Sequence, residues 1–212
     1  MEGRIWFPGN PWPDGHRIET FDWTGRLDDL GRLFFDLTLH SAAYDEAGDE
    51  DEGRDDQPDW EAPIVWNNYP RCTISSAFWD DATGLLAATP TRPFRLAGPE
   101  PQRLTADPLP VEDLDADPAF RVYLLGHDSV ADHTLTFTAD GTGGHHIDWI
   151  GRIALTYAGD ETFRHEFRAE IRGARLARVA PAEGMTDDEA TLRVSHLLGL
   201  PEQLAARLLT NA

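Results

Sequence analysis

The sequence predicts a mainly β protein, either an antiparallel β-sandwich or an open barrel, with a short C-terminal helical segment. Three observations indicate this fold class. Apolar and polar residues alternate along several short segments, glycine-rich turns separate some of these segments, and a helix-capping pattern occurs near the C-terminus. A chain of 212 residues with a hydrophobic fraction of 41% is long enough to bury a core as one unit. We therefore expect a single domain over residues 1–212.

The N-terminal part contains a clear strand between two irregular segments. The prolines of residues 6–13 exclude a helix and indicate an extended chain. Residues 33–39 alternate strictly between apolar and polar side chains, which predicts a half-buried strand. Residues 45–61 hold ten acidic side chains against one arginine, so we expect a mobile acidic surface loop there.

The middle of the chain is less regular. We expect a short β segment at residues 64–69 and another at residues 72–79. Residues 90–118 contain seven of the fifteen prolines. Because proline cannot donate to a β-ladder, this stretch predicts a long connection or a set of edge segments.

Three consecutive antiparallel strands are predicted between residues 133 and 172. Residues 133–139 form the first strand, and the sequence Asp-Gly-Thr-Gly-Gly at 140–144 is typical of a hairpin turn. The returning strand has apolar residues on one face, and the strand at 163–172 carries alternating arginine and glutamate on its polar face. That charge pattern is typical of a sheet face in contact with solvent.

Two short helices are expected at about residues 186–210. Thr186 and Glu189 form a capping box, and apolar residues follow it at helical spacing. Gly199 and Pro201 separate the two helices. We expect them to pack on the sheet.

Residues 21–27 are similar to residues 147–153, because both segments share Asp, Trp, Gly and Arg at equivalent positions. In each segment the tryptophan, Trp23 or Trp149, falls on the apolar face. A duplicated β unit would explain the similarity, and so would chance reuse of a strand pattern in which glycine permits a bulge.

The formal net charge of −20 limits the partners that this chain can bind. Phosphate groups would be repelled, so we expect no nucleic-acid partner and no anionic membrane partner. All basic residues are arginine. The absence of lysine excludes a lysine Schiff base and a phosphate loop that depends on lysine.

The chain has one cysteine, Cys72, which excludes an intrachain disulfide. Its surroundings in the sequence are typical of a strand, so we interpret it as a small buried side chain. The N-terminus lacks a long apolar stretch after a basic start, and no apolar run approaches about 20 residues. We therefore expect a cytoplasmic protein.

Histidine and aspartate side chains are concentrated on or beside the three predicted strands. Such residues from neighbouring strands could hold a divalent metal. The candidate ligands are His127, His133, His145, His146, Asp148 and His165. Alternation divides them, because it places His145 and His165 on the apolar face and His146 and Asp148 on the other. Neither face supplies a complete ligand set, and imidazoles satisfied by ordinary hydrogen bonds are the alternative.

The leading function hypothesis is a non-enzymatic binding or regulatory module for a basic protein partner. The net charge and the absence of a specific catalytic pattern favour it. A metal-dependent enzyme built on residues 127–165 is the first alternative. A carbohydrate or peptide binder that uses exposed tryptophans is the second, with candidates Trp6, Trp12, Trp60, Trp66 and Trp79. The oligomeric state stays open.

Overall fold

The computed structural model describes residues 1–47, 57–79, 82–111 and 117–210. Its strands are β1 (Glu2–Trp6), β2 (His16–Leu27), β3 (Leu33–Ser41), β4 (Thr73–Ser75), β5 (Leu85–Ala88), β6 (Gln102–Ala106), β7 (Arg121–Tyr123), β8 (Ser129–Ala139), β9 (His145–Ala154), β10 (His165–Ala174) and β11 (Val179–Ala180). The helices are α1 (Pro63–Trp66), α2 (Asp187–Leu198) and α3 (Glu202–Thr210), with short 3-10 turns η1 (Tyr44–Ala47) and η2 (Thr156–Ala158).

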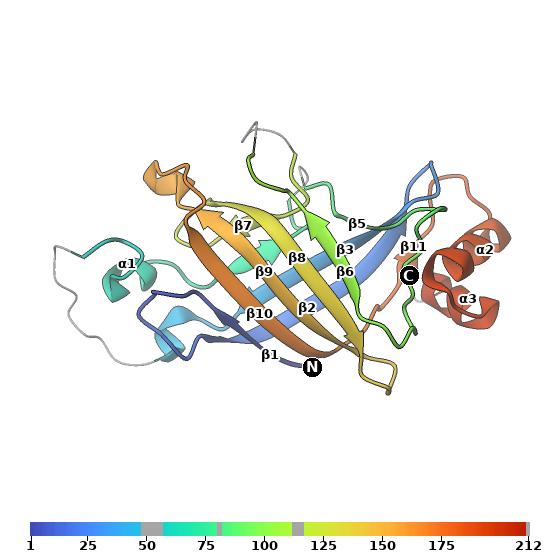
Figure 1. Cartoon of the computed structure of the whole chain (residues 1–212), viewed down its shortest axis with the longest axis horizontal. Coiled ribbons are helices and arrows are strands. Elements are labelled where there is room, and N and C mark those ends of the chain that lie inside the picture. Colours follow the sequence, from blue (N-terminus) through green and yellow to red (C-terminus); the bar gives the residue numbers. More distant parts are fainter. Residues whose placement is uncertain (48–56, 80–81, 112–116, 211–212) are drawn as a thin grey trace.

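The strands form a curled half-barrel sheet (Figure 1). Its order is β6-β8-β9-β10-β1-β2-β3-β4-β7, with β5 added to β3 and β11 added to β2. Neighbouring strands in the main path are antiparallel, whereas the short β11 runs parallel to β2. The predicted mainly antiparallel open barrel with C-terminal helices is therefore confirmed.

Alternating sequence patterns produce the central strands. In β3 buried residues alternate without exception with half-buried ones, as the sequence predicted. The hairpin between β8 and β9 is held by Asp140, whose Oδ1 accepts hydrogen bonds from the N–H groups of Thr142 and Gly144 at 2.7 and 3.0 Å. β10 then pairs with β9, so the predicted set of three consecutive antiparallel strands is also confirmed.

The two faces of the sheet differ in polarity. The concave face is apolar, and its largest buried aromatic side chains include Trp23, Phe35, Phe137, Trp149 and Phe167. The convex face of β9 and β10 carries the charged side chains, for example the Arg152–Glu166 ion pair at 3.0 Å. Both of these side chains are well exposed, so the pair contributes at most about 1 kcal/mol to stability. Burial inside the curl is thus the main stabilising term.

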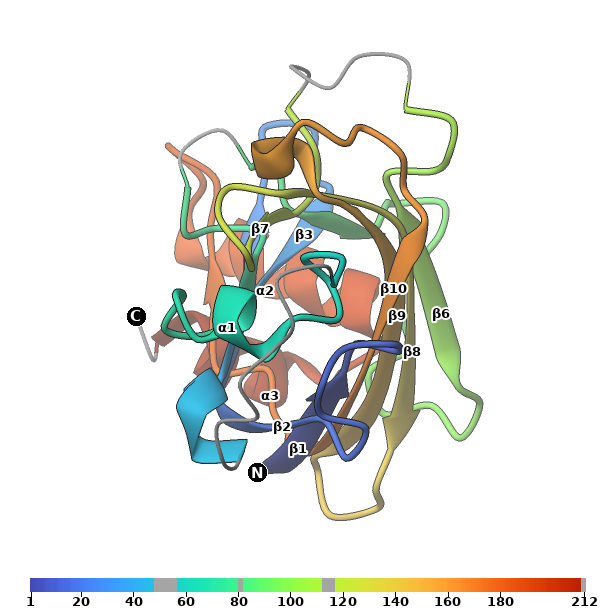
Figure 2. The ribbon, with the colours of Figure 1, turned by 90° about the vertical axis from the view of Figure 1, so that its left-hand side faces the viewer.

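Different segments cover the two ends of the curled sheet. Figure 2 views the molecule from one end, with α1 in front and with α2 and α3 behind. At the far end, the carbonyl groups of Leu197 and Leu198 in α2 accept hydrogen bonds from the N–H groups of Phe94 and Leu96 at 2.8 and 3.0 Å. α2 begins at the predicted capping box of Thr186, so this helix is fixed at both of its ends. Within the described ranges, no helix is long and apolar enough to span a membrane.

Two expectations for the middle of the chain need correction or refinement. The β segment predicted at residues 64–69 is wrong, because α1 lies there. Proline at the first helical position and a buried Trp66 favour that helical turn over a strand. The proline-rich stretch does contain an edge segment, since β6 pairs with β8 at the border of the sheet. Most of the predicted acidic loop, residues 48–56, lies outside the described residues.

Candidate functional site

The α1 end of the barrel is closed by aromatic side chains. We call this group the aromatic cluster; it comprises Phe7, Trp12, His16, Tyr44, Trp60 and Trp66, with ring centroids of neighbouring members 5.1 to 6.4 Å apart. The indole N–H of Trp66 donates to the carbonyl of Trp60 at 2.9 Å, and the indole N–H of Trp60 donates to the carbonyl of Pro8 at 2.9 Å. Through these bonds, α1 is held against the loop after β1.

A hollow of about 200 Å³ lies beside this cluster. Three segments that are distant in sequence form it: the chain around α1, the loop between β7 and β8, and the turn η2 after β9. We call it the tyrosine–carboxylate pocket, and its lining residues are Asp59, Val65, Tyr69, Leu125, Asp128, Leu155, Tyr157 and Ala158. Apolar side chains, phenol rings and carboxylates therefore meet in one small concave space.

Asp128 holds two walls of this pocket together. Its residue is 6% exposed, and its Oδ2 accepts a hydrogen bond from the N–H of Leu125 at 3.0 Å. Its Oδ1 accepts another from the N–H of Tyr157 at 3.3 Å. Burial raises the pKa of the Asp128 carboxyl, and these two N–H donors oppose that shift. The carboxylate thus connects the β7–β8 loop to η2.

Tyr69 and Tyr157 supply the aromatic part of the pocket. Tyr157 is 65% exposed, and its ring lies over Gly126, where a Cβ atom would come within 2.5 Å of the ring. Gly126 also has a φ of 125°, so both space and backbone conformation favour glycine there. Partial burial raises the pKa of Tyr69, and the nearby Tyr157 phenol and Asp128 carboxylate raise it further. The phenols and the carboxylate therefore lie close together.

Asp59 brings a second carboxylate to the pocket, and its side chain is exposed. It makes no hydrogen bond or ion pair with the described part of the chain. The described residues that line the pocket include no arginine and no histidine. The nearest basic side chain to Asp128 is that of its neighbour His127, which lies outside this lining and lowers the pKa of the Asp128 carboxyl. Carboxylates beside phenol rings create a site of negative potential that attracts cations.

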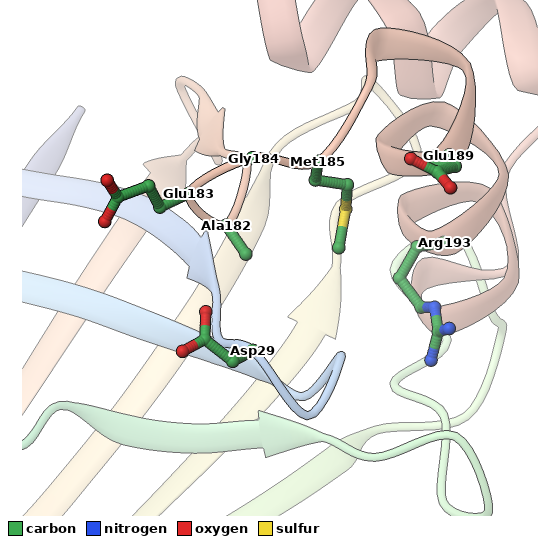
Figure 3. Close-up of a pocket in the computed structure, with 7 residues that line it drawn as sticks. All are labelled: Asp29, Ala182, Glu183, Gly184, Met185, Glu189 and Arg193. Carbon is green, nitrogen blue, oxygen red and sulfur yellow. The ribbon is translucent and has the colours of Figure 1, made fainter.

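Two other hollows occur on the described surface. One of about 490 Å³ lies outside the aromatic cluster, where Trp6 and Trp12 are half-buried and the Arg168 guanidinium carbon is 5.8 Å from the Trp6 ring centroid. The other, of about 410 Å³, lies near α2 (Figure 3). There the Arg193 side chain extends from α2 toward the turn between β2 and β3, which carries Asp29. The hollow near α2 is lined by both acidic and basic side chains, so its charge favours a cationic ligand less clearly than that of the tyrosine–carboxylate pocket.

The predicted metal ligands do not converge. His133 is fully buried inside the barrel, where its Nδ1 accepts a hydrogen bond from the Trp149 indole at 3.1 Å. His145 is also buried, with its Nε2 2.8 Å from the carbonyl of Leu96 near the α2 end. His146, the next residue of β9, lies on the opposite, convex face, with its Nε2 3.2 Å from Oδ1 of Asp148.

The remaining two candidates lie at the α1 end. His165 stacks on the Trp60 ring with 3.9 Å between centroids, and His127 is exposed beside the Tyr123 ring at 5.4 Å. Across the described ranges, no group of three His, Cys, Asp or Glu side chains is arranged to hold a metal. The predicted ligands are separated because strand alternation sends neighbours to opposite faces and because their strands place them at different ends. The geometry therefore gives the metal hypothesis no support.

Cys72 and the tryptophans can also be placed. Cys72 is completely buried, as the sequence suggested, and burial raises the pKa of its thiol. Of the tryptophans proposed as a platform, Trp60 and Trp66 are buried, whereas Trp6, Trp12 and Trp79 are half-buried.

Sequence reasoning missed the residues of the tyrosine–carboxylate pocket. Asp59 and Tyr69 lie near α1, whereas Asp128 and Tyr157 come from two segments that are distant in the sequence, and the four residues share no motif. No pattern in the sequence links the four side chains. Their proximity depends on the curl of the sheet, which no local pattern encodes. Comparison with known proteins adds no constraint: no family model, no curated protein and no solved structure matches this chain.

Proposed function

We propose that this chain is a non-enzymatic binding module that engages a basic protein partner through the α1 end of its barrel. The observation that carries the proposal is the tyrosine–carboxylate pocket, where Asp59 and Asp128 line one hollow without a neighbouring arginine. The net charge of −20 adds long-range attraction for a basic surface. The pocket then supplies a specific point of contact within that general attraction.

Cys72 and His133 are poorly placed for catalysis. The thiol of Cys72 is buried and its pKa is raised, so little thiolate forms. Burial lowers the pKa of His133 to about 3, and its side chain is sealed from solvent. Neither group can meet a substrate without opening the core, which favours binding over chemistry at these positions.

Matched charge variants test the proposal. The immobilised wild-type chain would be used for capture at low ionic strength from the native host, beside Asp59→Asn and Asp29→Asn. Each substitution removes one exposed charge, but only Asp59 lines the pocket, whereas Asp29 lies in the hollow near α2. We expect a basic partner that Asp29→Asn retains and Asp59→Asn loses, with affinity that falls as salt rises.

Two results would contradict the proposal. A captured protein that binds equally well to both variants would place the interface elsewhere. Captured proteins that are acidic, or whose affinity is unchanged between about 0.05 and 0.5 M salt, would remove the electrostatic basis of the interaction.

A second candidate function is supported by the hollow beside Trp6 and Trp12. Two half-buried indoles, Trp6 with the Arg168 guanidinium over its ring and Trp12, are suited to contact with a sugar ring or an extended peptide. Trp12→Ala should then abolish a fluorescence change on titration with a carbohydrate or proline-rich peptide library. An unchanged response in that variant, or no response in the wild type, would reject this candidate.

A further inference from the structure

We propose that the tyrosine–carboxylate pocket binds a single organic cation, the ammonium or guanidinium end of a lysine or arginine side chain presented by the partner. This inference rests on the proposed function and names the chemical group that the site recognises. The pocket combines the features that select such a group: phenol rings, carboxylates and an apolar floor.

The shape and composition of the pocket fit a cationic side chain better than a metal ion. Val65, Leu125 and Leu155 contribute apolar surface, and the last two of these are about nine-tenths buried or more. A bare metal ion gains nothing from such surface, whereas the methylene groups of a lysine or arginine side chain do. The volume of about 200 Å³ gives room for a short alkyl chain together with its charged head.

The phenol rings add attraction that a neutral ligand lacks. A cation near the face of a tyrosine ring is attracted by the ring quadrupole. The Tyr69 and Tyr157 phenols lie near enough to interact, and Asp128 and Asp59 lie near the same Tyr69 phenol. A cation in this pocket would therefore be surrounded by aromatic and anionic groups from three separate segments.

The pocket is built to stay open without its ligand. Asp128 is fixed by the N–H groups of Leu125 and Tyr157, and the Tyr157 ring is supported by Gly126. The hydroxyl groups of Ser129 and Thr156 lie 3.1 Å apart and add a link between the first residue of β8 and η2. Because these bonds exist in the free protein, binding has little ordering entropy to overcome.

Small-molecule probes test the inference without the partner. Butylguanidinium would be titrated into isotopically labelled full-length protein, with butylurea as its neutral isostere, and backbone amide shifts would be followed by NMR. We expect a Kd of about 1 mM for the cation, and binding of the urea weaker by at least about tenfold. The shifts should concentrate at residues 124–128 and 155–158. A butylammonium arm then shows which cationic head the pocket prefers.

Three variants and one control variant, Asp29→Asn, separate the contributions. Tyr157→Leu should weaken butylguanidinium binding by about threefold, since it removes one ring, whereas Tyr157→Phe keeps the ring and should bind as the wild type does. Asp59→Asn should weaken binding by about twofold, and Asp29→Asn should leave it unchanged. Tyr157 and Asp59 are exposed, so all three proteins should fold, which circular dichroism verifies.

Equal binding of butylurea and butylguanidinium would overturn the inference, as would shifts that map to the hollow near α2. These outcomes are distinct from failure of the proposed function. If the cation does not bind but a basic partner is still lost in Asp59→Asn, the partner uses this end without inserting a side chain. If the cation binds but no basic partner exists, the site is real and its ligand is a free amine or guanidine.

Discussion

Acidification from pH 7 to pH 5 should destabilise this protein through histidines that the fold keeps neutral, and His133 provides the sharpest test. Its imidazole is buried among Phe120, Trp149 and Phe167. Nδ1 accepts the Trp149 indole N–H, so Nε2 carries the proton of the neutral ring. The nearest carboxylate oxygen to that nitrogen, Oδ2 of Asp107, is 3.7 Å away, beyond hydrogen-bond distance.

The magnitude follows from the two pKa values. Burial lowers the pKa of His133 from 6.5 to about 3 in the folded protein. At pH 5 the unfolded chain binds a proton at this residue and the folded chain does not, so the unfolded state is favoured. The stability from the neutral ring is complete above about pH 6.5 and is lost progressively as the pH falls toward 3. At 1.36 kcal/mol per pH unit, the free energy of unfolding should fall by about 2 kcal/mol between pH 7 and pH 5.

The assay compares urea unfolding of the wild type and His133→Gln at both pH values. Glutamine has no titration in this range, and its amide oxygen can still accept the indole N–H of Trp149. The decrease in unfolding free energy from pH 7 to pH 5 should therefore be about 2 kcal/mol smaller in the variant. Other histidines contribute equally to both proteins; His16, whose pKa burial lowers to about 4, is the largest of them.

An NMR titration of the wild type provides an independent check. The His133 ring signals should not shift between pH 7 and pH 5. Equal decreases in unfolding free energy for both proteins, or a ring titration near pH 6.5, would refute the buried neutral imidazole.

Two further predictions concern packing and capping. Gly151→Ala should lower the free energy of unfolding in urea by about 1–3 kcal/mol, because the added Cβ would lie 2.5 Å from the buried Phe167 ring. Gly25→Ala is the control and should change it by less than about 1 kcal/mol, since the closest contact of its added Cβ is 3.3 Å. Equal effects at the two glycines would contradict this packing argument. Thr186→Ala should lower the free energy of unfolding by about 1 kcal/mol, because it removes the hydroxyl that accepts a hydrogen bond from the N–H of Glu189. Thr186→Ser should retain wild-type stability. A wild-type Tm in the alanine variant would exclude a role for this cap.

The sequence predicted those parts of the fold whose signals are local. Strands β8, β9 and β10 follow from alternation and from a turn with its required glycines, and α2 follows from a capping box. α1 was missed because a helix of four residues shows no periodicity. The paired tryptophan segments around Trp23 and Trp149 both lie on the concave face, but their indoles differ. The Trp149 N–H donates to His133, whereas the Trp23 N–H is buried without a partner among the described residues.

The candidate site was less predictable than the fold, for a physical reason. Alternation correctly separated His145, which is buried, from His146, which lies on the convex face. It could not bring Asp59 beside Asp128, because their proximity requires the chain around α1 to cross the end of the curled sheet. The face of a residue on one strand follows from the period of that strand, but a site assembled from three connections depends on how the whole chain folds.

The two ends of the barrel are closed in different ways. At the α2 end, a regular helix is held by backbone hydrogen bonds, and the hollow of about 410 Å³ beside it is lined by charged groups of both signs. At the α1 end, a four-residue helix and large rigid rings meet at steep angles, for example 87° between Phe7 and Trp60 and 78° between Trp12 and Trp66. Phe7 and Trp12 of this cluster line the hollow of about 490 Å³, so rings that stabilise the fold at this end also contribute surface on which a ligand can bind.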